Sequence, residues 1–161
     1  MKKFLLLIAV ALFATSAFAQ DFSLGARVGS GFQAVAQYNT NSSEYLEARF
    51  GASWTNPTGF VTADFTALYN WRVAEMDWTP STGLWFVDLG AGVNVGGREN
   101  YAYVGAAGMA RLGVNLGHSV ALSLDWTPAI GPRIFYAYGY SAAEFNAIGL
   151  ANVGLSCTYR F

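Results

Sequence analysis

Apolar and polar side chains alternate along most of this chain with a period of two residues. In residues 44–54, for example, Leu46 and Phe50 share one face of the pattern, while Glu47 and Arg49 share the other. Successive side chains of a β-strand point to opposite faces of its sheet, so this period indicates strands with one apolar and one polar face. The pattern predicts eight such strands, over residues 22–38, 44–54, 60–72, 83–95, 101–116, 119–127, 133–140 and 147–161.

Apart from charges at the first position of a strand, the charged side chains within these strands all lie on the polar face, where five arginines accompany four acids. That face is also rich in glycine, which suits a tight barrel interior better than a surface that faces water. Arginine binds carboxylates through two parallel hydrogen bonds, so near-balanced charges can pair inside such a barrel. The sequence therefore predicts a lumen charge network of Arg27, Glu47, Arg49, Asp64, Arg72, Asp88, Arg111, Asp125 and Arg160.

The composition favours placing the apolar face against lipid. The chain is 53% hydrophobic, yet after residue 19 no apolar run reaches the ~20 residues that a membrane-spanning helix needs. A transmembrane barrel spreads its apolar residues over alternate positions and carries aromatic girdles near its strand ends. Aromatic residues occupy such positions at Tyr38, Trp54, Tyr69, Trp71, Trp85, Trp126, Tyr159 and Phe161.

These observations predict an all-β protein, an eight-stranded antiparallel up-and-down transmembrane β-barrel. The alternative fold is a soluble exported β-sandwich, in which the apolar faces would meet each other in a core.

The first residues have the order of a secretory signal peptide: two lysines, an apolar run, and small residues at Ala17 and Ala19. We expect cleavage after Ala19, which makes 1–19 the signal peptide and 20–161 the barrel. Removal of both lysines leaves seven arginines against ten acids, a net charge of −3. This balance argues against nucleic acid as a partner.

The C-terminal sequence NVGLSCTYRF combines a polar residue, a glycine, alternating hydrophobic residues and a terminal aromatic. It resembles the C-terminal assembly signal of bacterial outer-membrane β-barrels, and the whole mature chain resembles the small eight-stranded barrels of the OmpA/OmpX transmembrane type. The resemblance implies insertion by the barrel assembly machinery and a location in the outer membrane of a Gram-negative bacterium. The matching positions are Asn152, Gly154, Cys157, Tyr159 and Phe161.

An even number of strands puts both termini of such a barrel at its periplasmic end. With one continuous strand through residue 38, the breaks NTNSS, VAEMDWTPST, GH and SAAEFN are extracellular, whereas NPTG, GGREN and PAIGP are periplasmic. In the alternative topology Gly29-Ser30-Gly31 is a turn, and one long loop follows residues 119–127. The two ends then exchange for every intervening turn. We take the first topology as the prediction because it keeps the alternation unbroken.

We expect no catalytic site and no cofactor. His118 is the only histidine and lies beside Ser119 in a short turn, without an adjacent acid to orient it as a nucleophile triad requires. The motif of the lipid A deacylases is missing, so a lipid A-modifying outer-membrane enzyme stays only as an alternative function. One histidine and one cysteine make no transition-metal cluster.

Eight strands leave an interior that side chains fill, so we expect little or no pore activity. Met76 and Trp78, in the break VAEMDWTPST, are candidate contacts for an unknown surface ligand, or else an interfacial anchor. The sequence thus predicts a small outer-membrane barrel with a structural or surface-interaction role. Its expected partners are outer-membrane lipid, the assembly machinery and that surface ligand.

Overall fold

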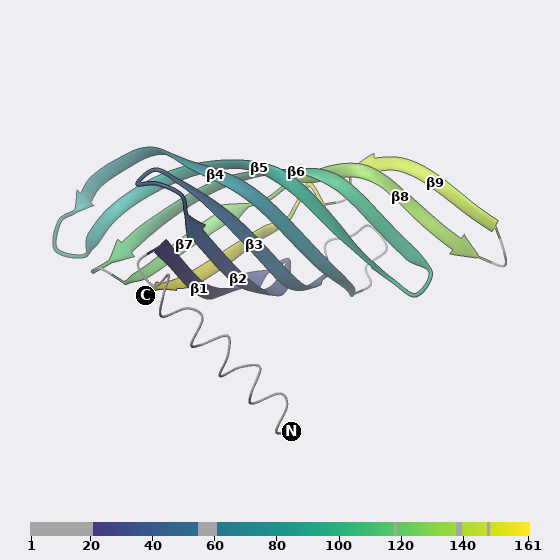
Figure 1. Cartoon of the computed structure of the whole chain (residues 1–161), viewed down its shortest axis with the longest axis horizontal. Coiled ribbons are helices and arrows are strands. Elements are labelled where there is room, and N and C mark those ends of the chain that lie inside the picture. Colours follow the sequence, from purple (N-terminus) through teal and green to yellow (C-terminus); the bar gives the residue numbers. More distant parts are fainter. Residues whose placement is uncertain (1–20, 55–60, 118, 138–139, 148) are drawn as a thin grey trace, which may run out of the picture.

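In the described residues, ten β-strands form one antiparallel sheet (Figure 1). The computed structural model describes residues 21–54, 61–117, 119–137, 140–147 and 149–161, so the predicted signal peptide and His118 lie outside it. The strands are β1 (Phe22–Gly29), β2 (Gly31–Asn39), β3 (Glu44–Ser53), β4 (Thr62–Thr79), β5 (Gly83–Arg98), β6 (Tyr101–Leu116), β7 (Val120–Trp126), β8 (Ala129–Ala137), β9 (Tyr140–Ala147) and β10 (Val153–Arg160).

The sheet closes on itself. Strands β1 to β7 pair in sequence order, and β10 pairs with both β7 and β1, which completes a ring of eight strands among the described residues. The predicted eight-stranded antiparallel β-barrel is therefore confirmed. The β-sandwich alternative is wrong, because one closed sheet is present in place of two stacked ones.

Strands β7 and β8 continue one another along β6. Ala110 pairs with Trp126 in β7, and Ala106 pairs with Ile130 in β8, in the same register. Strand β9 returns along β8, so the β8–β9 hairpin extends the wall at the end of the barrel opposite β10 (right side of Figure 1). We call the end where β1 begins and β10 ends the terminal end, and the other the opposite end.

The first predicted topology is wrong at its first strand. Gly29-Ser30-Gly31 is a turn, because β1 and β2 pair antiparallel on either side of it with Val28 facing Phe32. The Ser30 backbone joins this turn to two neighbours, through hydrogen bonds from its N–H to Val153 and from Trp54 to its carbonyl. The chain segment NTNSS consequently lies at the terminal end, where β1 begins and β10 ends.

Three predicted loops are largely strand. Most of VAEMDWTPST belongs to β4, which runs to Thr79 after a bulge between Arg72 and Ala74. Much of PAIGP belongs to β8, and SAAEFN lies within β9. The long loop that the alternative topology places after residues 119–127 is replaced by the β8–β9 hairpin. Pro132 is tolerated in β8 because the β6–β8 ladder has a gap between Arg133 and Ile130.

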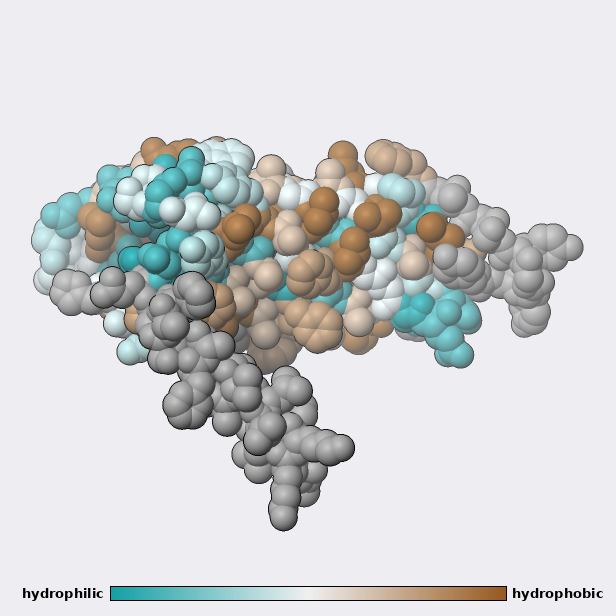
Figure 2. Space-filling model, in the orientation of Figure 1, coloured by the Kyte–Doolittle hydropathy of each residue, from teal (hydrophilic) through white to brown (hydrophobic). Residues whose placement is uncertain are grey.

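The apolar face of the alternation lies outside the barrel. Among the described residues, 29 large hydrophobic side chains are exposed, and those on the outer wall include Phe50 at 66% and Leu155 at 60% exposure. Brown, hydrophobic atoms gather over the middle of the visible face, and teal, hydrophilic atoms gather at the terminal end (Figure 2). No helix in the described part of the chain has the length and apolarity needed to cross a membrane.

Aromatic side chains mark both rims of this outer wall. Near the terminal end, Tyr38 pairs with Phe22, and Tyr159 lies against Phe161 with ring centroids 5.2 Å apart. Near the opposite rim, the exposed side chain of Trp126 donates a hydrogen bond to the carbonyl of Leu150. The two groups of rings bracket the apolar wall.

Candidate functional site in the barrel interior

Five charged side chains meet across the interior of the barrel. Arg27 on β1 donates to Asp125 on β7 at 2.8 Å, and Arg49 on β3 approaches the same Asp125 oxygen at 3.2 Å. Glu47 lies two residues from Arg49 on the same inner face of β3 and pairs with it. Arg111 on β6 binds both Glu47 oxygens at 2.9 Å through its two terminal nitrogens. All five side chains are almost fully buried.

Neutral side chains extend this cluster. Gln33 accepts a hydrogen bond from Arg27 at 3.2 Å and donates one to Asp64 at 2.7 Å, so it links the Arg27 guanidinium to the Asp64 carboxylate. Arg27 also donates to Asn152, and Ser156 donates to Asp125. The network thus joins strands that lie on different sides of the ring, which braces the barrel from within.

A second group lies nearer the terminal end. Arg72 pairs with Asp88 at 3.0 Å, and its guanidinium lies over the Phe86 ring at 4.3 Å from the ring centre. Asp88 accepts a hydrogen bond from Tyr45, whose hydroxyl in turn accepts one from Arg111. This chain of contacts connects the second group to the first.

The structure brings together most of the nine residues predicted for the lumen network. Arg72 is partly exposed and also pairs with Glu75, whereas Arg160 is exposed at the end of β10, where its N–H bonds the carbonyl of Ser119. The other seven are buried in the interior: Arg27, Glu47, Arg49, Asp64, Asp88, Arg111 and Asp125.

Sequence reasoning missed several interior residues. Arg133 is only 3% exposed, although the predicted network omits it because it stands at the edge of the predicted strand 133–140. The signal was available: from Asp125 through Thr127 and Ala129 to Arg133, odd-numbered positions keep the inner face in one register. Buried Tyr45 is also missing from the predicted lumen network, because that network consists of charged residues alone.

Glycines on the inner face make room for this network. A Cβ on Gly154 would lie 2.6 Å from the central guanidinium carbon of Arg27, and one on Gly90 would overlap the side-chain oxygen of Asn70. Both distances are far below ordinary van der Waals contact. The glycine-rich inner face is therefore a packing requirement of large polar side chains in a narrow barrel.

A polar cavity of about 280 Å³ opens at the terminal end of the interior. Its lining includes Arg72, Asp88, Arg111, Arg160 and Ser119. The charged cluster closes its floor, since Arg111 reaches both the cavity and the buried Glu47. The cavity is a polar recess that ends at the charged cluster.

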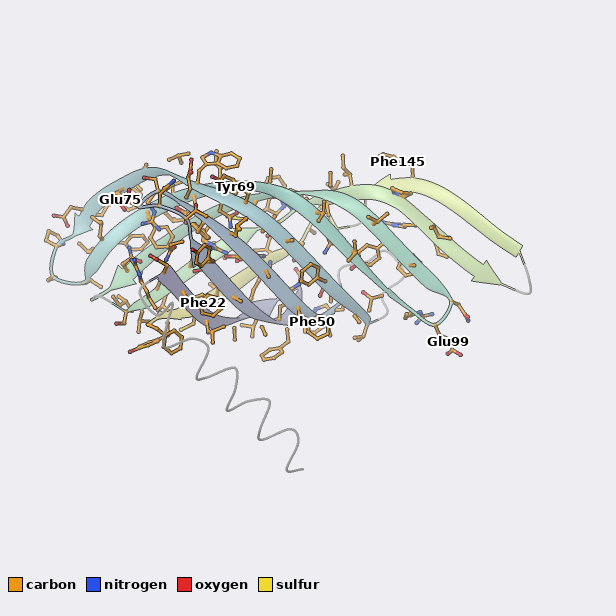
Figure 3. The ribbon with its side chains drawn as sticks, in the orientation of Figure 1. Phe22, Phe50, Tyr69, Glu75, Glu99 and Phe145 are labelled. Atoms are coloured by element: carbon orange, nitrogen blue, oxygen red, sulfur yellow. The ribbon has the colours of Figure 1, made fainter. Side chains whose placement is uncertain are left out.

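The interior towards the opposite end is more apolar. Leu68, Tyr101, Tyr103 and Met109 form one buried cluster, and the Tyr101 ring lies 5.2 Å from that of Phe135. Together with the charged cluster, these side chains occupy the barrel along its length. Phe22, Phe50, Tyr69 and Phe145 point away from the ribbon, and Glu75 and Glu99 lie towards its two ends (Figure 3).

The remaining predicted residues fall on several surfaces. Met76 is partly exposed and Trp78 is exposed, and both lie on β4, with the Trp78 ring 5.6 Å from that of Trp85. The assembly-signal positions divide between Asn152 and Gly154 on the inner face and the outward-facing Cys157, Tyr159 and Phe161.

Within the described residues, no group of three or more histidine, cysteine or acidic side chains is arranged to hold a metal ion. The fold and its interior define a small closed β-barrel with a charged, filled lumen. The chain matches no protein-family model, and no curated protein matches it significantly.

Proposed function

We propose that this protein is an exported outer-membrane β-barrel of a Gram-negative bacterium, with a structural or surface-interaction role and without catalysis. One observation carries the proposal: the barrel is inverted relative to a soluble protein. Among the described residues, eight charged side chains are buried at 1–4% exposure, while Phe50 and Leu155 are among the many large apolar side chains on the outside. Lipid is the solvent that suits such a wall.

Closure of the ring supports the same proposal. A barrel satisfies every strand edge internally, which is what a β-structure needs in a bilayer. The aromatic side chains at both rims fit the two membrane surfaces. The resemblance of the last strand to an assembly signal agrees with insertion by the barrel assembly machinery.

In this proposal the terminal end faces the periplasm, as both termini lie there. The extracellular end then carries the turn at Ser30, the connection between β5 and β6, and the β8–β9 hairpin. The hairpin extends farthest and is the part of the protein best placed for contact with a surface ligand (Figure 1). Met76 and Trp78 would instead lie at the periplasmic surface, as an interfacial anchor.

The filled interior supports a barrel that conducts few or no ions. Arg27, Arg49 and Asp125 cross the lumen, and the Leu68 cluster fills it farther along. The lipid A-modifying enzyme is disfavoured on geometry, because Ser119 lines the cavity at the terminal end. That end lies away from the outer leaflet in the proposed orientation.

The test is fractionation of cells that express the full-length chain, followed by SDS gels of unheated and boiled samples. We expect the protein in the outer-membrane fraction, with a mobility that changes on boiling. Recovery from the soluble periplasm would refute the membrane proposal. Lipid A whose mass spectrum changes with the wild type, but not with His118→Ala and Ser119→Ala, would refute the non-catalytic role.

A further inference from the structure

Three alanines form the floor of an apolar groove on the outer wall. Cross-strand pairing aligns Ala36 of β2 with Ala48 of β3, and Ala48 with Ala67 of β4. All three are partly covered by their neighbours, whereas Ala106, which also faces outwards on β6, is exposed. The groove is specific to this part of the wall.

Larger side chains form the walls of this groove. On the terminal side the same three strands align Tyr38, Leu46 and Tyr69, which line the groove. Two residues beyond its floor on the other side, Phe50 pairs with Phe65. The resulting space has a volume of about 450 Å³. This volume lies within the ~300–1,000 Å³ of typical small-molecule sites.

A carboxylate stands at the terminal side of the groove. Glu44 shares the outer face of β3 with Leu46 and Ala48, and lies four residues from Ala48, about 13 Å along an extended strand. Tyr69, which lines the groove, donates a hydrogen bond to Glu44 at 2.7 Å, and Asn41 donates another at 2.6 Å. Hydrogen bonds donated to a carboxylate stabilise its ionised form, so these two contacts favour a negative charge on Glu44.

We propose that this groove binds one phospholipid with an ammonium headgroup, of the phosphatidylethanolamine kind. An acyl chain lies over Ala36, Ala48 and Ala67, and the ammonium group pairs with Glu44. The apolar floor suits the chain, and the charge of Glu44 suits a cationic group while it repels an anionic one. The inference rests on the proposed membrane location and adds a lipid class to it.

A second copy of the barrel is a poorer occupant. Two convex barrel walls touch along a narrow strip, so a recess between rows of aromatic side chains is better filled by a flexible chain. The Glu44 carboxylate at one end of the groove can pair with the ammonium group of a lipid. On another copy of this barrel it would meet a second Glu44, which carries the same charge.

Native mass spectrometry of the purified mature barrel in detergent tests the proposal. Dioleoyl phosphatidylethanolamine is compared with dioleoyl phosphatidylglycerol, which has the same chains. We expect one retained lipid and a preference of about threefold for the ethanolamine lipid, the scale of an exposed ion pair. Glu44→Gln should abolish this preference, since it removes the charge and keeps the shape.

Ala48→Phe fills the floor of the groove with an aromatic ring. The control, Ala106→Phe, adds the same ring on the outer face of β6, where there is no groove. We expect about tenfold weaker lipid retention for Ala48→Phe, which corresponds to lost contact with about two methylene groups, and no change for Ala106→Phe. If Ala48→Phe does not fold, Ala36→Phe replaces it. Folding of every variant is checked by its heat-dependent gel mobility.

Equal lipid retention by Ala48→Phe and the wild type would overturn the groove assignment, as would a preference for phosphatidylglycerol. A dimer that Ala48→Phe abolishes would identify a second copy as the occupant and would also overturn it. These outcomes leave heat-dependent mobility and outer-membrane fractionation unaffected. Failure of the lipid site is thus distinguishable from failure of the proposed membrane location.

Discussion

Replacing Asp125 with alanine should be among the most destabilising single changes in this barrel. Asp125 accepts hydrogen bonds from Arg27 at 2.8 Å, Arg49 at 3.2 Å and Ser156 at 2.9 Å. Without it, Arg27 loses its ion pair, whereas Arg49 and Arg111 keep their pairs with Glu47. Breaking a buried ion pair by removing one partner costs about 3–5 kcal/mol.

The remaining contacts place the expected cost near the lower end of that range. Arg27 keeps hydrogen bonds to Gln33 and Asn152, and Arg49 keeps Glu47. The loss should therefore be about 3 kcal/mol. Asp125→Asn keeps the shape and one acceptor but removes the charge, so we expect an intermediate value.

The assay is urea unfolding of the barrel refolded into detergent micelles, followed by heat-dependent gel mobility and tryptophan fluorescence. With a denaturant slope of about 1–3 kcal/mol per M, a loss of 3 kcal/mol lowers the urea midpoint by about 1 M or more. Glu99→Ala, which removes the same charge from an exposed turn, is the matched control and should change stability by less than about 0.5 kcal/mol. Equal midpoints for Asp125→Ala and Glu99→Ala would refute the account of the interior as a water-poor ion network.

Three further predictions concern the lumen packing, the first turn and the outer wall. Gly154→Ala should cost about 1–3 kcal/mol in the same unfolding assay, because its Cβ displaces the Arg27 guanidinium; an unchanged midpoint would mean that Arg27 has room to move. Gly29→Ala should lower the refolding yield on heat-shift gels, since Gly29 has φ of 149° and the added Cβ would overlap the Val153 carbonyl. The control Ser30→Ala leaves the Ser30 backbone hydrogen bonds in place and should refold with a far smaller loss. Cys157, exposed on the outer wall between Ala26 and Leu122, should resist a polar, membrane-impermeant maleimide in outer membranes and react with an apolar one; rapid labelling by the polar reagent in intact membranes would place this wall in water.

The fold could be predicted from the sequence because two-residue alternation and the position of charges are local signals. The alternation did not reveal the first turn because Val28 and Phe32 face each other across Ser30. The outward-facing positions therefore have the same parity in β1 and β2. The alternation passes through this turn without a break. A pattern of period two cannot distinguish one long strand from such a hairpin.

The interior cluster was predictable as a set of residues but not as a set of partners. Charges on the polar face of separate strands must meet inside a closed barrel, and this placed Arg27 and Asp125 in one lumen. Their pairing depends on strand register and stagger, which bring residues 98 positions apart within 2.8 Å. The alanine groove was missed for the same reason, because Ala36, Ala48 and Ala67 become neighbours only through register.

The pairing of β10 with both β1 and β7 has a consequence for biogenesis. Of the strands in the ring, β10 is the last to leave the ribosome, and without it the edges of β1 and β7 are both open. Open edges are not tolerated in a bilayer and promote aggregation in water. A nascent chain that stops before Val153 therefore cannot close the ring, and under the proposed membrane location it would have no form that could be inserted. The strand that closes the ring would thus also act as a check that the rest of the barrel has been made.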